Sequence, residues 1–241
     1  MSNHFVITGI PRSGTSLLCR MMNALDNVAC FNEIVYEVPM LPAAFSTLRT
    51  MLLLDEAVPN KNTTDAQTDR AGIEWARVEK PVDKNVTLGL KANVPFLTNM
   101  PQIMGFGYKI IAVIRDPMYT IGSWNLPKCA NINEHDVRSN PRYEGFPFKT
   151  HDRFNCEAEI WNHFAELILE HSKNVIFVKY ESLTEVTSVA MDMLTSKLGL
   201  KGSVQMPVRC MNDVNRYPHI EEIRQAVSRY APAMKAFGYT V

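Results

Sequence analysis

The sequence has no excess of charge, no cysteine pattern and no long uncharged apolar run, and each of these absences excludes a class of protein. Its 25 basic and 25 acidic residues cancel, so nothing indicates a nucleic-acid partner or attraction to an anionic membrane. The five cysteines show no C-x-x-C or other metal spacing, which argues against a disulfide scaffold and against a zinc site. The most apolar stretch, 34–54, is broken by Glu37, Arg49 and two prolines, so it does not predict a membrane span.

Further absences concern location and domain organisation. No basic and apolar leader precedes the first predicted strand, and together with unpaired cysteines this predicts a cytoplasmic protein. No internal repeat or low-complexity tract divides the 241 residues, of which 46% are hydrophobic. A chain of this length and composition buries a full core as one α/β unit, so we expect a single domain over residues 1–241. The sequence does not define an oligomeric state.

A glycine-rich turn near the start of the chain has the form of an anion site. The run Thr8-Gly-Ile-Pro-Arg-Ser-Gly-Thr-Ser16 lies between an apolar strand-like segment, 5–10, and apolar residues at helical spacing from Leu17 to Leu25. A turn in this place begins a helix, where free backbone N–H groups and the helix dipole favour phosphate or sulfate. We expect the anion to contact Pro11, Arg12, Ser13, Gly14, Thr15 and Ser16.

The same turn argues against nucleoside-triphosphate chemistry. Gly9 and Gly14 keep the G-x-x-x-x-G spacing, but Thr15 stands where such loops carry the lysine that reaches the β- and γ-phosphates. The positive charge lies within the turn instead, as Arg12, whose guanidinium can bond an oxyanion through two parallel N–H groups. A cation, Arg115, also precedes Asp116, the one candidate carboxylate for magnesium. We therefore expect no metal.

A second anion site is predicted after another buried strand. The apolar run 108–114 is typical of a central parallel strand, and Arg115 follows it at the carboxyl end, where open α/β sheets bind ligands. Asp116-Pro117 then predicts a helix start, and Ser123 lies about two turns further on. The guanidinium of Arg115 and the hydroxyl of Ser123 together supply hydrogen-bond donors for a second phosphate group. A structural alternative, in which Arg115 pairs with a carboxylate, stays open.

These segments together resemble the sulfotransferases that use 3′-phosphoadenosine 5′-phosphosulfate (PAPS), and the resemblance extends over most of the chain. The first turn is similar to their 5′-phosphosulfate loop, in the PRSGT form of Golgi and tyrosylprotein enzymes, and 111–123 is similar to their 3′-phosphate segment. Val175-Ile-Phe-Val-Lys-Tyr-Glu-Ser-Leu183 resembles their "RYEDL" strand end, and 194–200 their "FLGL" stretch. The resemblance implies the sulfotransferase fold: a parallel sheet with helices on both faces, like that of P-loop nucleotide-binding proteins.

The resemblance also assigns roles. Glu33, twenty-one residues after Arg12, stands where tyrosylprotein-type enzymes have their general base, although Val35 replaces the arginine that follows it in those enzymes and leaves a peptide-tyrosine acceptor in doubt. An apolar setting among Phe31, Ile34 and Val35 would raise the pKa of this carboxylate toward the range useful in base catalysis. Glu37, His135 and His151 are reserve bases.

Two further basic residues follow from the resemblance. Lys91, ahead of a Pro95-Phe96 pair, stands where the family places a lysine near the transferring sulfonate. Arg216 lies in the region whose basic residues contact the 3′-phosphate, although the family's "RKG" triplet is absent.

The function implied is in-line transfer of a sulfonate from PAPS to a hydroxyl or amine acceptor, catalysed by Glu33, Arg12 and Lys91. The sequence leaves the acceptor open among sugars, lipids, phenols, peptides and small alcohols. Two alternatives remain: a P-loop kinase or NTPase, and a non-catalytic protein that binds 3′-phosphoadenosine 5′-phosphate (PAP).

Three other segments carry structural expectations. The mixed charges of 55–84 predict a helical surface excursion, and the long segment 126–154 suggests a lid over the acceptor. The last amphipathic helix is expected to be interrupted at Pro232.

Overall fold

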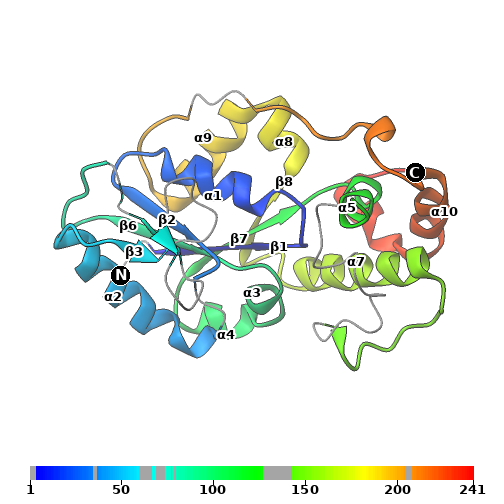
Figure 1. The fold of residues 1–241 in the computed structure, drawn as a ribbon, viewed down its shortest axis with the longest axis horizontal. Helices are drawn as coiled ribbons and strands as arrows, with labels where there is room; N and C mark the ends of the chain where they lie inside the picture. Colours follow the sequence, from blue (N-terminus) through cyan, green and yellow to red (C-terminus); the bar gives the residue numbers. More distant parts are fainter. Residues whose placement is uncertain are drawn as a thin grey trace.

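The computed structural model describes residues 4–34, 37–59, 67–68, 74–76, 78, 80–126, 143–204 and 208–241. Its centre is a five-stranded sheet in the order β2-β6-β1-β7-β8 (Figure 1), and every neighbouring pair of strands is parallel. The strands are β1 (Phe5–Gly9), β2 (Val28–Asn32), β6 (Thr87–Lys91), β7 (Lys109–Ile114) and β8 (Val175–Lys179). The predicted parallel sheet is confirmed, with the first strand at its centre.

Alternation of side chains along the strands divides the hydrophobic core into two layers. Phe5 and Ile7 of β1 point into one layer and Val6 into the other. In β7, Ile111 and Val113 lie in the same layer as Phe5 and Ile7. The side chains of Ile110, Ala112 and Ile114 lie in the other layer, with Val6. Successive side chains of a strand point to opposite faces, so a sheet with apolar residues at every position must be covered on both sides.

Helices cover both faces, as the sequence predicted (Figure 1). One layer is formed by α1 (Thr15–Asn23), α8 (Tyr180–Glu185) and α9 (Thr187–Leu198). The other is formed by α2 (Leu41–Leu53), α3 (Val94–Thr98), α4 (Met100–Gly105) and α7 (Arg153–Glu170). The short helix η1 (Val38–Met40) precedes α2.

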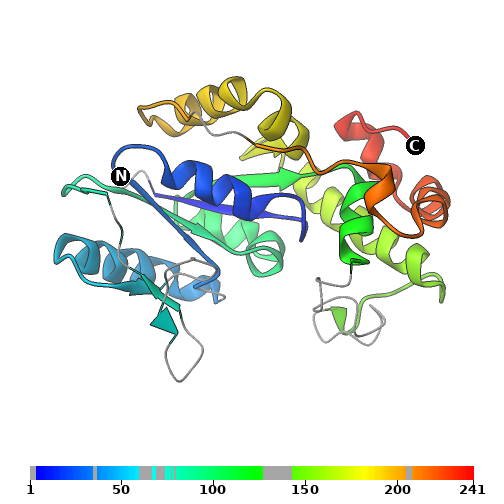
Figure 2. The same ribbon diagram turned by 45° about the horizontal axis from the view of Figure 1, so that its top comes forward.

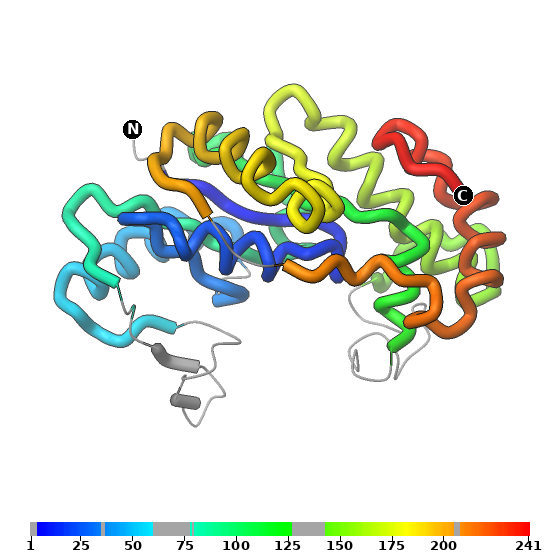
Figure 3. Tube along the Cα trace, turned by 90° about the horizontal axis from the view of Figure 1, so that it is seen from above, coloured from blue at the N-terminus to red at the C-terminus, as the bar shows by residue number. Residues whose placement is uncertain are grey.

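Three further helices pack beside α7 at the end of the molecule away from α2 (Figures 2 and 3): α5 (Pro117–Trp124), α10 (Ile220–Tyr230) and η5 (Pro232–Phe237). The short helix η4 (Val214–Arg216) precedes α10. The break between α10 and η5 falls at Pro232, as expected from its missing N–H donor. No helix in the described ranges has the length and apolar character needed to cross a bilayer.

The expectation of a helical excursion over 55–84 was wrong. The described parts of this segment form a small antiparallel sheet of β3 (Val58–Pro59), β5 (Glu74–Ala76) and β4 (Gln67–Thr68). Val58, which pairs with Ala76, is buried in the main core. Mixed charges mark a solvated face but do not distinguish a helix from a hairpin, and the tertiary anchor at Val58 favours the extended form.

Candidate active site

The turn after β1 leads directly into α1, and its shape depends on glycine. Gly14 is the N-cap residue of α1, with φ 98°, and it has no side chain to bond the first amides of the helix. A Cβ at this position would lie 2.5 Å from Cδ2 of Tyr180. Only glycine fits both the left-handed backbone and this close approach. The first-turn N–H groups and the positive end of the helix dipole therefore face the strand ends, in the geometry that binds anions.

Three hydrogen bonds hold the turn in place. Ser13 Oγ donates to the carbonyl of Val113 at 2.8 Å, and Thr15 Oγ1 donates to Asn93 Oδ1 at 2.8 Å. The indole N–H of Trp124 donates to the Pro11 carbonyl at 2.8 Å. The hydroxyl groups of Ser13 and Thr15, two of the residues expected to contact the anion, thus bond to protein acceptors. The backbone N–H of Ser13 also donates within the turn, to the Ile10 carbonyl at 3.0 Å.

Arg12 is the exposed cation of the turn. Its φ is 70°, a left-handed conformation that non-glycine residues adopt at a cost of about 1–3 kcal/mol. Its Nε donates to Ser123 Oγ on α5 at 3.2 Å. The side chain is solvent-accessible, so the rest of the guanidinium lies at the surface of the site. The structure therefore brings together Arg12 and Ser123, which lie 111 positions apart in the sequence.

Arg115 lies beside the same turn, but it is buried and extensively bonded. Its Nη1 donates to the Arg12 carbonyl at 3.3 Å, and Nε donates to Asn212 Oδ1 at 2.8 Å. Nη2 donates to the Met211 carbonyl at 3.1 Å and to the Tyr217 hydroxyl at 2.9 Å. All four acceptors are neutral oxygens. The alternative left open by the sequence, in which Arg115 pairs with a carboxylate, is therefore not observed among the described residues.

The buried guanidinium is also stacked on an aromatic ring. The Arg115 guanidinium carbon lies 4.5 Å from the ring centroid of Tyr180, the same ring that excludes a side chain at Gly14. Cation–π contact of a desolvated arginine adds to its hydrogen bonds. The strand end of β8, which supplies Tyr180, thus supports both the turn and Arg115.

Glu181 forms a second layer of contacts behind Arg115. Its Oε1 accepts from Asn212 Nδ2 at 2.8 Å and from the Asp116 backbone N–H at 3.2 Å, and its Oε2 accepts from the Tyr239 hydroxyl at 2.8 Å. Burial, with the charge of Glu181 and this hydrogen bond, raises the pKa of Tyr239, so the phenol stays protonated. Glu181 therefore orients Asn212, which in turn bonds Arg115.

Asp116 caps α5 next to this network. Its carboxylate accepts the N–H of Met118 at 2.8 Å. The pKa of Asp116 is raised to about 6, chiefly by burial and also by the neighbouring Glu181 charge, while the helix amides and Arg115 act in the opposite direction. The predicted helix start at Asp116-Pro117 is confirmed.

Glu33 and Lys91 form an ion pair at the ends of β2 and β6. Lys91 Nζ lies 2.6 Å from Glu33 Oε1; the lysine side chain is 2% exposed and that of Glu33 is 24% exposed. The Glu33 N–H donates to the Lys91 carbonyl at 2.8 Å, which continues the strand pairing by one residue. Glu33 has φ 53°. Its surroundings differ from the apolar setting expected from the sequence, because the carboxylate pairs with a buried ammonium.

The remaining candidates occupy other positions. Arg216 ends η4, is exposed, and places its guanidinium carbon 6.0 Å from the ring centroid of Tyr217, whose hydroxyl bonds Arg115. Glu37 is exposed before η1, and His151 is exposed before α7. His135 lies outside the described residues, as does Val35.

Several residues of the site carried no assigned role in the sequence. Tyr180 and Glu181 belong to the segment that resembles the family's strand end, so a signal existed there. Asn93, Asn212 and Tyr217 gave none, because isolated polar residues in loops acquire partners only through the fold. Asn93 joins the turn to the end of β6: its carbonyl accepts from Thr8 Oγ1 at 2.8 Å, and its side chain accepts from Thr15.

The described residues contain no group of three histidine, cysteine, aspartate or glutamate side chains arranged to hold a metal ion. Each candidate cation of the site is an arginine or a lysine. The class that the fold defines is an α/β protein with a P-loop-like anion turn after its central strand.

The chain belongs to the sulfotransferase domain family, whose model matches residues 2–216. A sulfotransferase from Alicyclobacillus acidocaldarius has the same fold, with TM-score 0.54, 14% identity and coverage of 97% of this chain and 94% of that one. The sulfotransferase domain of the Synechococcus PCC 7002 olefin synthase gives TM-score 0.52, 15% identity and coverage of 99% and 95%. Sulfotransferase STF9 from Mycobacterium avium gives a TM-score of 0.50 and 10% identity, with coverage of 100% of this chain and 78% of that one. No curated protein sequence matches the chain. The resemblance stated from the sequence motifs is confirmed at the level of the family.

Proposed function

We propose that this sulfotransferase takes its sulfonate from PAPS and transfers it to a hydroxyl or amine acceptor, with Glu33 as the general base. The observation that carries the proposal is the convergence of two pairs at adjoining strand ends. Arg12 and Arg115 lie after β1 and β7, and Glu33 and Lys91 lie at the ends of β2 and β6. An exposed cation with its buried arginine support, and a carboxylate paired with a lysine, thus lie at the carboxyl ends of adjoining strands.

The turn after β1 suits the 5′-phosphosulfate. The uncapped amides of α1 and the exposed guanidinium of Arg12 supply N–H donors to its oxygens. Ser123, which bonds Arg12, and Arg216, whose guanidinium lies near the Tyr217 ring, are the groups proposed for the 3′-phosphate. Arg115 contributes mainly by holding Arg12 through its carbonyl, since four of its five N–H groups already bond protein oxygens.

The proposed reaction is a single displacement at sulfur. Glu33 accepts the proton of the acceptor hydroxyl while the hydroxyl oxygen forms a bond to sulfur. The bond from sulfur to the bridging oxygen breaks, its electron pair stays on that oxygen, and PAP leaves. Lys91 holds the Glu33 carboxylate at 2.6 Å and places a positive charge at the strand ends. Fixed donors of this kind contribute about 10²–10³ in rate and a general base about 10²–10⁴.

Calorimetry distinguishes the proposal from a kinase or NTPase. We expect PAP to bind without magnesium and Mg-ATP to bind far more weakly. Tighter binding of Mg-ATP than of PAP would contradict the proposal and favour the kinase alternative.

Turnover of labelled PAPS on a pool of acceptors then distinguishes an enzyme from a PAP-binding protein. We expect Glu33→Gln to lower turnover by about 10²–10⁴-fold with PAP affinity unchanged, since the amide keeps the shape and a hydrogen-bond acceptor for Lys91. Glu37→Gln, His135→Asn and His151→Asn are matched variants of the reserve bases and are expected to keep activity. Loss of activity in one of these, with Glu33→Gln active, would move the base to that residue.

A further inference from the structure

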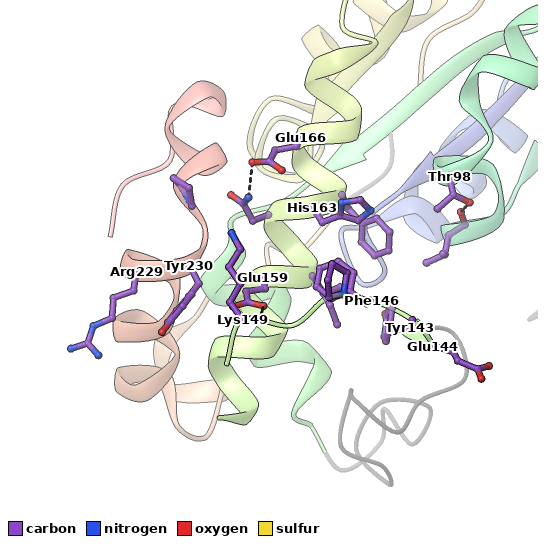
Figure 4. Close-up of a pocket in the computed structure, with 17 residues that line it drawn as sticks. Thr98, Tyr143, Glu144, Phe146, Lys149, Glu159, His163, Glu166, Arg229 and Tyr230 are labelled. Carbon is purple, nitrogen blue, oxygen red and sulfur yellow. Dashed lines mark hydrogen bonds between the residues drawn. The ribbon is translucent and has the colours of Figure 1, made fainter. Parts of the chain in front are cut away.

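A pocket of about 590 Å³ lies between α3, the segment 143–149, α7 and the α10–η5 corner (Figure 4). Its volume is in the range that holds small organic molecules. Aromatic rings line it: Tyr143, Phe146, Phe164 and Tyr230. The Phe146 ring also contacts Phe148 and His163, with centroids 4.7 Å and 5.4 Å away. Such a wall suits an apolar body rather than a sugar or a phosphate.

One carboxylate oxygen of the pocket is buried without a partner. Glu159, on α7, is 8% exposed. Its Oε2 accepts the backbone N–H of Lys149 at 2.9 Å, but its Oε1 has no hydrogen-bond partner among the described residues. Figure 4 shows Glu159 beside Lys149 among the pocket side chains. Because buried polar atoms are almost always bonded and an unbonded one is costly, this oxygen indicates a donor that comes from a ligand.

The charges of the pocket favour a cationic donor. Three carboxylates line it, Glu144, Glu159 and Glu166, against two cations, Lys149 and Arg229. Glu144 and Glu166 are exposed, and Glu166 already accepts from Asn162 Nδ2 at 2.8 Å. Interaction with a charge is strongest where water is excluded, so Glu159 is the position at which an ammonium group gains most.

The pocket adjoins the strand ends that carry the transfer groups. Val94, which lines it, follows Lys91 by three residues, so their Cα atoms are separated by at most about 11 Å. Between them, Asn93 bonds Thr15 of the anion turn. The wall of the pocket at Val94 and Thr98 of α3 is therefore the one nearest in sequence to the transfer groups.

We propose that this pocket binds an acceptor that carries an ammonium group on an apolar, preferably aromatic, body. The ammonium donates to Glu159 Oε1, the body lies against Tyr143, Phe146 and Phe164, and the hydroxyl lies toward α3. That the bound molecule is the sulfonate acceptor rests on the proposed function, whereas recognition of its amine by Glu159 does not.

Three probes that share a phenol ring and a two-carbon chain test the assignment: tyramine, 4-ethylphenol and 3-(4-hydroxyphenyl)propanoate. A fourth, 4-propylphenol, in which a methyl group replaces the ammonium of tyramine, is added as the uncharged probe of matched size. They are titrated calorimetrically into the full chain, with and without saturating PAP. We expect tyramine to bind about tenfold or more tightly than 4-ethylphenol and 4-propylphenol, and the propanoate to bind most weakly. Glu159→Gln is expected to abolish the preference for tyramine and to leave the affinity for 4-ethylphenol unchanged. Its amide oxygen still accepts from Lys149.

Glu166→Gln is the matched control, because it removes the same charge from the same pocket at an exposed, already bonded position. It is expected to keep the preference. Thermal unfolding of each variant, with Glu159→Asp as a second substitution, checks that the fold is intact. Equal affinity of the wild-type chain for tyramine and 4-ethylphenol would overturn the inference, as would a preference that survives in Glu159→Gln or disappears in Glu166→Gln.

The two proposals fail separately. If PAP does not bind but the tyramine preference depends on Glu159, the donor assignment is wrong and the pocket assignment stands. If PAP binds and the probes do not differ, the pocket assignment is wrong and the donor assignment stands.

Discussion

Arg12 and Arg115 lie at the carboxyl ends of adjacent strands, β1 and β7, but in opposite surroundings. Arg12 is exposed, has a left-handed backbone and makes one side-chain hydrogen bond, to Ser123. Arg115 is 4% exposed, donates four hydrogen bonds and stacks on Tyr180. A guanidinium that is already bonded holds its neighbours in place, whereas an exposed one is available to a ligand. We therefore expect Arg115 to govern stability and Arg12 to govern catalysis.

The largest effect is expected from Arg115→Ala. It leaves the half-buried Asn212 amide oxygen and the buried Tyr217 hydroxyl without their donor, and an unsatisfied buried group costs about 1–3 kcal/mol. We expect the free energy of unfolding, measured in urea, to fall by about 3–5 kcal/mol. Arg115→Lys keeps the charge but loses the planar fork, so it is expected to recover only part of this loss. A loss below about 1 kcal/mol for Arg115→Ala would contradict the positioning role.

Arg12→Ala is expected to change stability little and to lower catalytic activity strongly. Removing an exposed side chain changes stability by about 0.5 kcal/mol or less. Turnover of PAPS is expected to fall by about 10²–10³-fold, which corresponds to about 3–4 kcal/mol of transition-state stabilisation. Arg20→Ala is the control, since Arg20 is an exposed arginine at the other end of α1. An Arg12→Ala enzyme as active as Arg20→Ala would remove Arg12 from the catalytic groups.

Gly14→Ala tests the contact between the two regions. A Cβ there meets the Tyr180 ring at 2.5 Å and imposes a φ of 98° on alanine. Backbone strain and overpacking together predict a loss of about 2–4 kcal/mol in unfolding free energy, with weaker PAP binding. Gly105→Ala is the matched control, because nothing lies within 4 Å of its Cβ position. Equal stability of the two variants would show that Tyr180 does not constrain the turn.

The smallest effect concerns pH. Burial raises the pKa of Asp116 to about 6 from 3.8, so the folded state holds this proton more tightly than the unfolded chain. The resulting stabilisation is present below about pH 4 and is lost as the pH rises through 6. Asp116→Asn keeps an N-cap acceptor but does not titrate. Relative to the wild type, its free energy of unfolding is expected to rise by about 1–3 kcal/mol between pH 4 and pH 7.

Asp152→Asn, the same substitution at the exposed N-cap of α7, controls for the change of N-cap residue. A flat pH profile for Asp116→Asn would show that the carboxyl is not kept protonated by its burial.

Much of the fold was predictable because its signals are local. Apolar β-branched runs predicted β1 and β7, and proline and aspartate predicted the start of α5 and the break before η5. The segment 55–84 was not predictable, since its short strands depend on the burial of Val58 in the main core and on its pairing with Ala76. A charge pattern indicates which residues face water, but it does not indicate whether those residues lie on a helix or on a strand.

The sequence by itself determined which groups reach the strand ends. The turn with Arg12, the strand before Arg115, and Lys91 follow from patterns within a few residues of each other, as does membership of the family. Only the tertiary structure decided what each group does there. It paired Lys91 with Glu33, gave the hydroxyls of Ser13 and Thr15 to protein acceptors, and enclosed Arg115 between residues nearly a hundred positions away. Hydrogen-bond partners depend on the approach of remote segments, which no local pattern encodes.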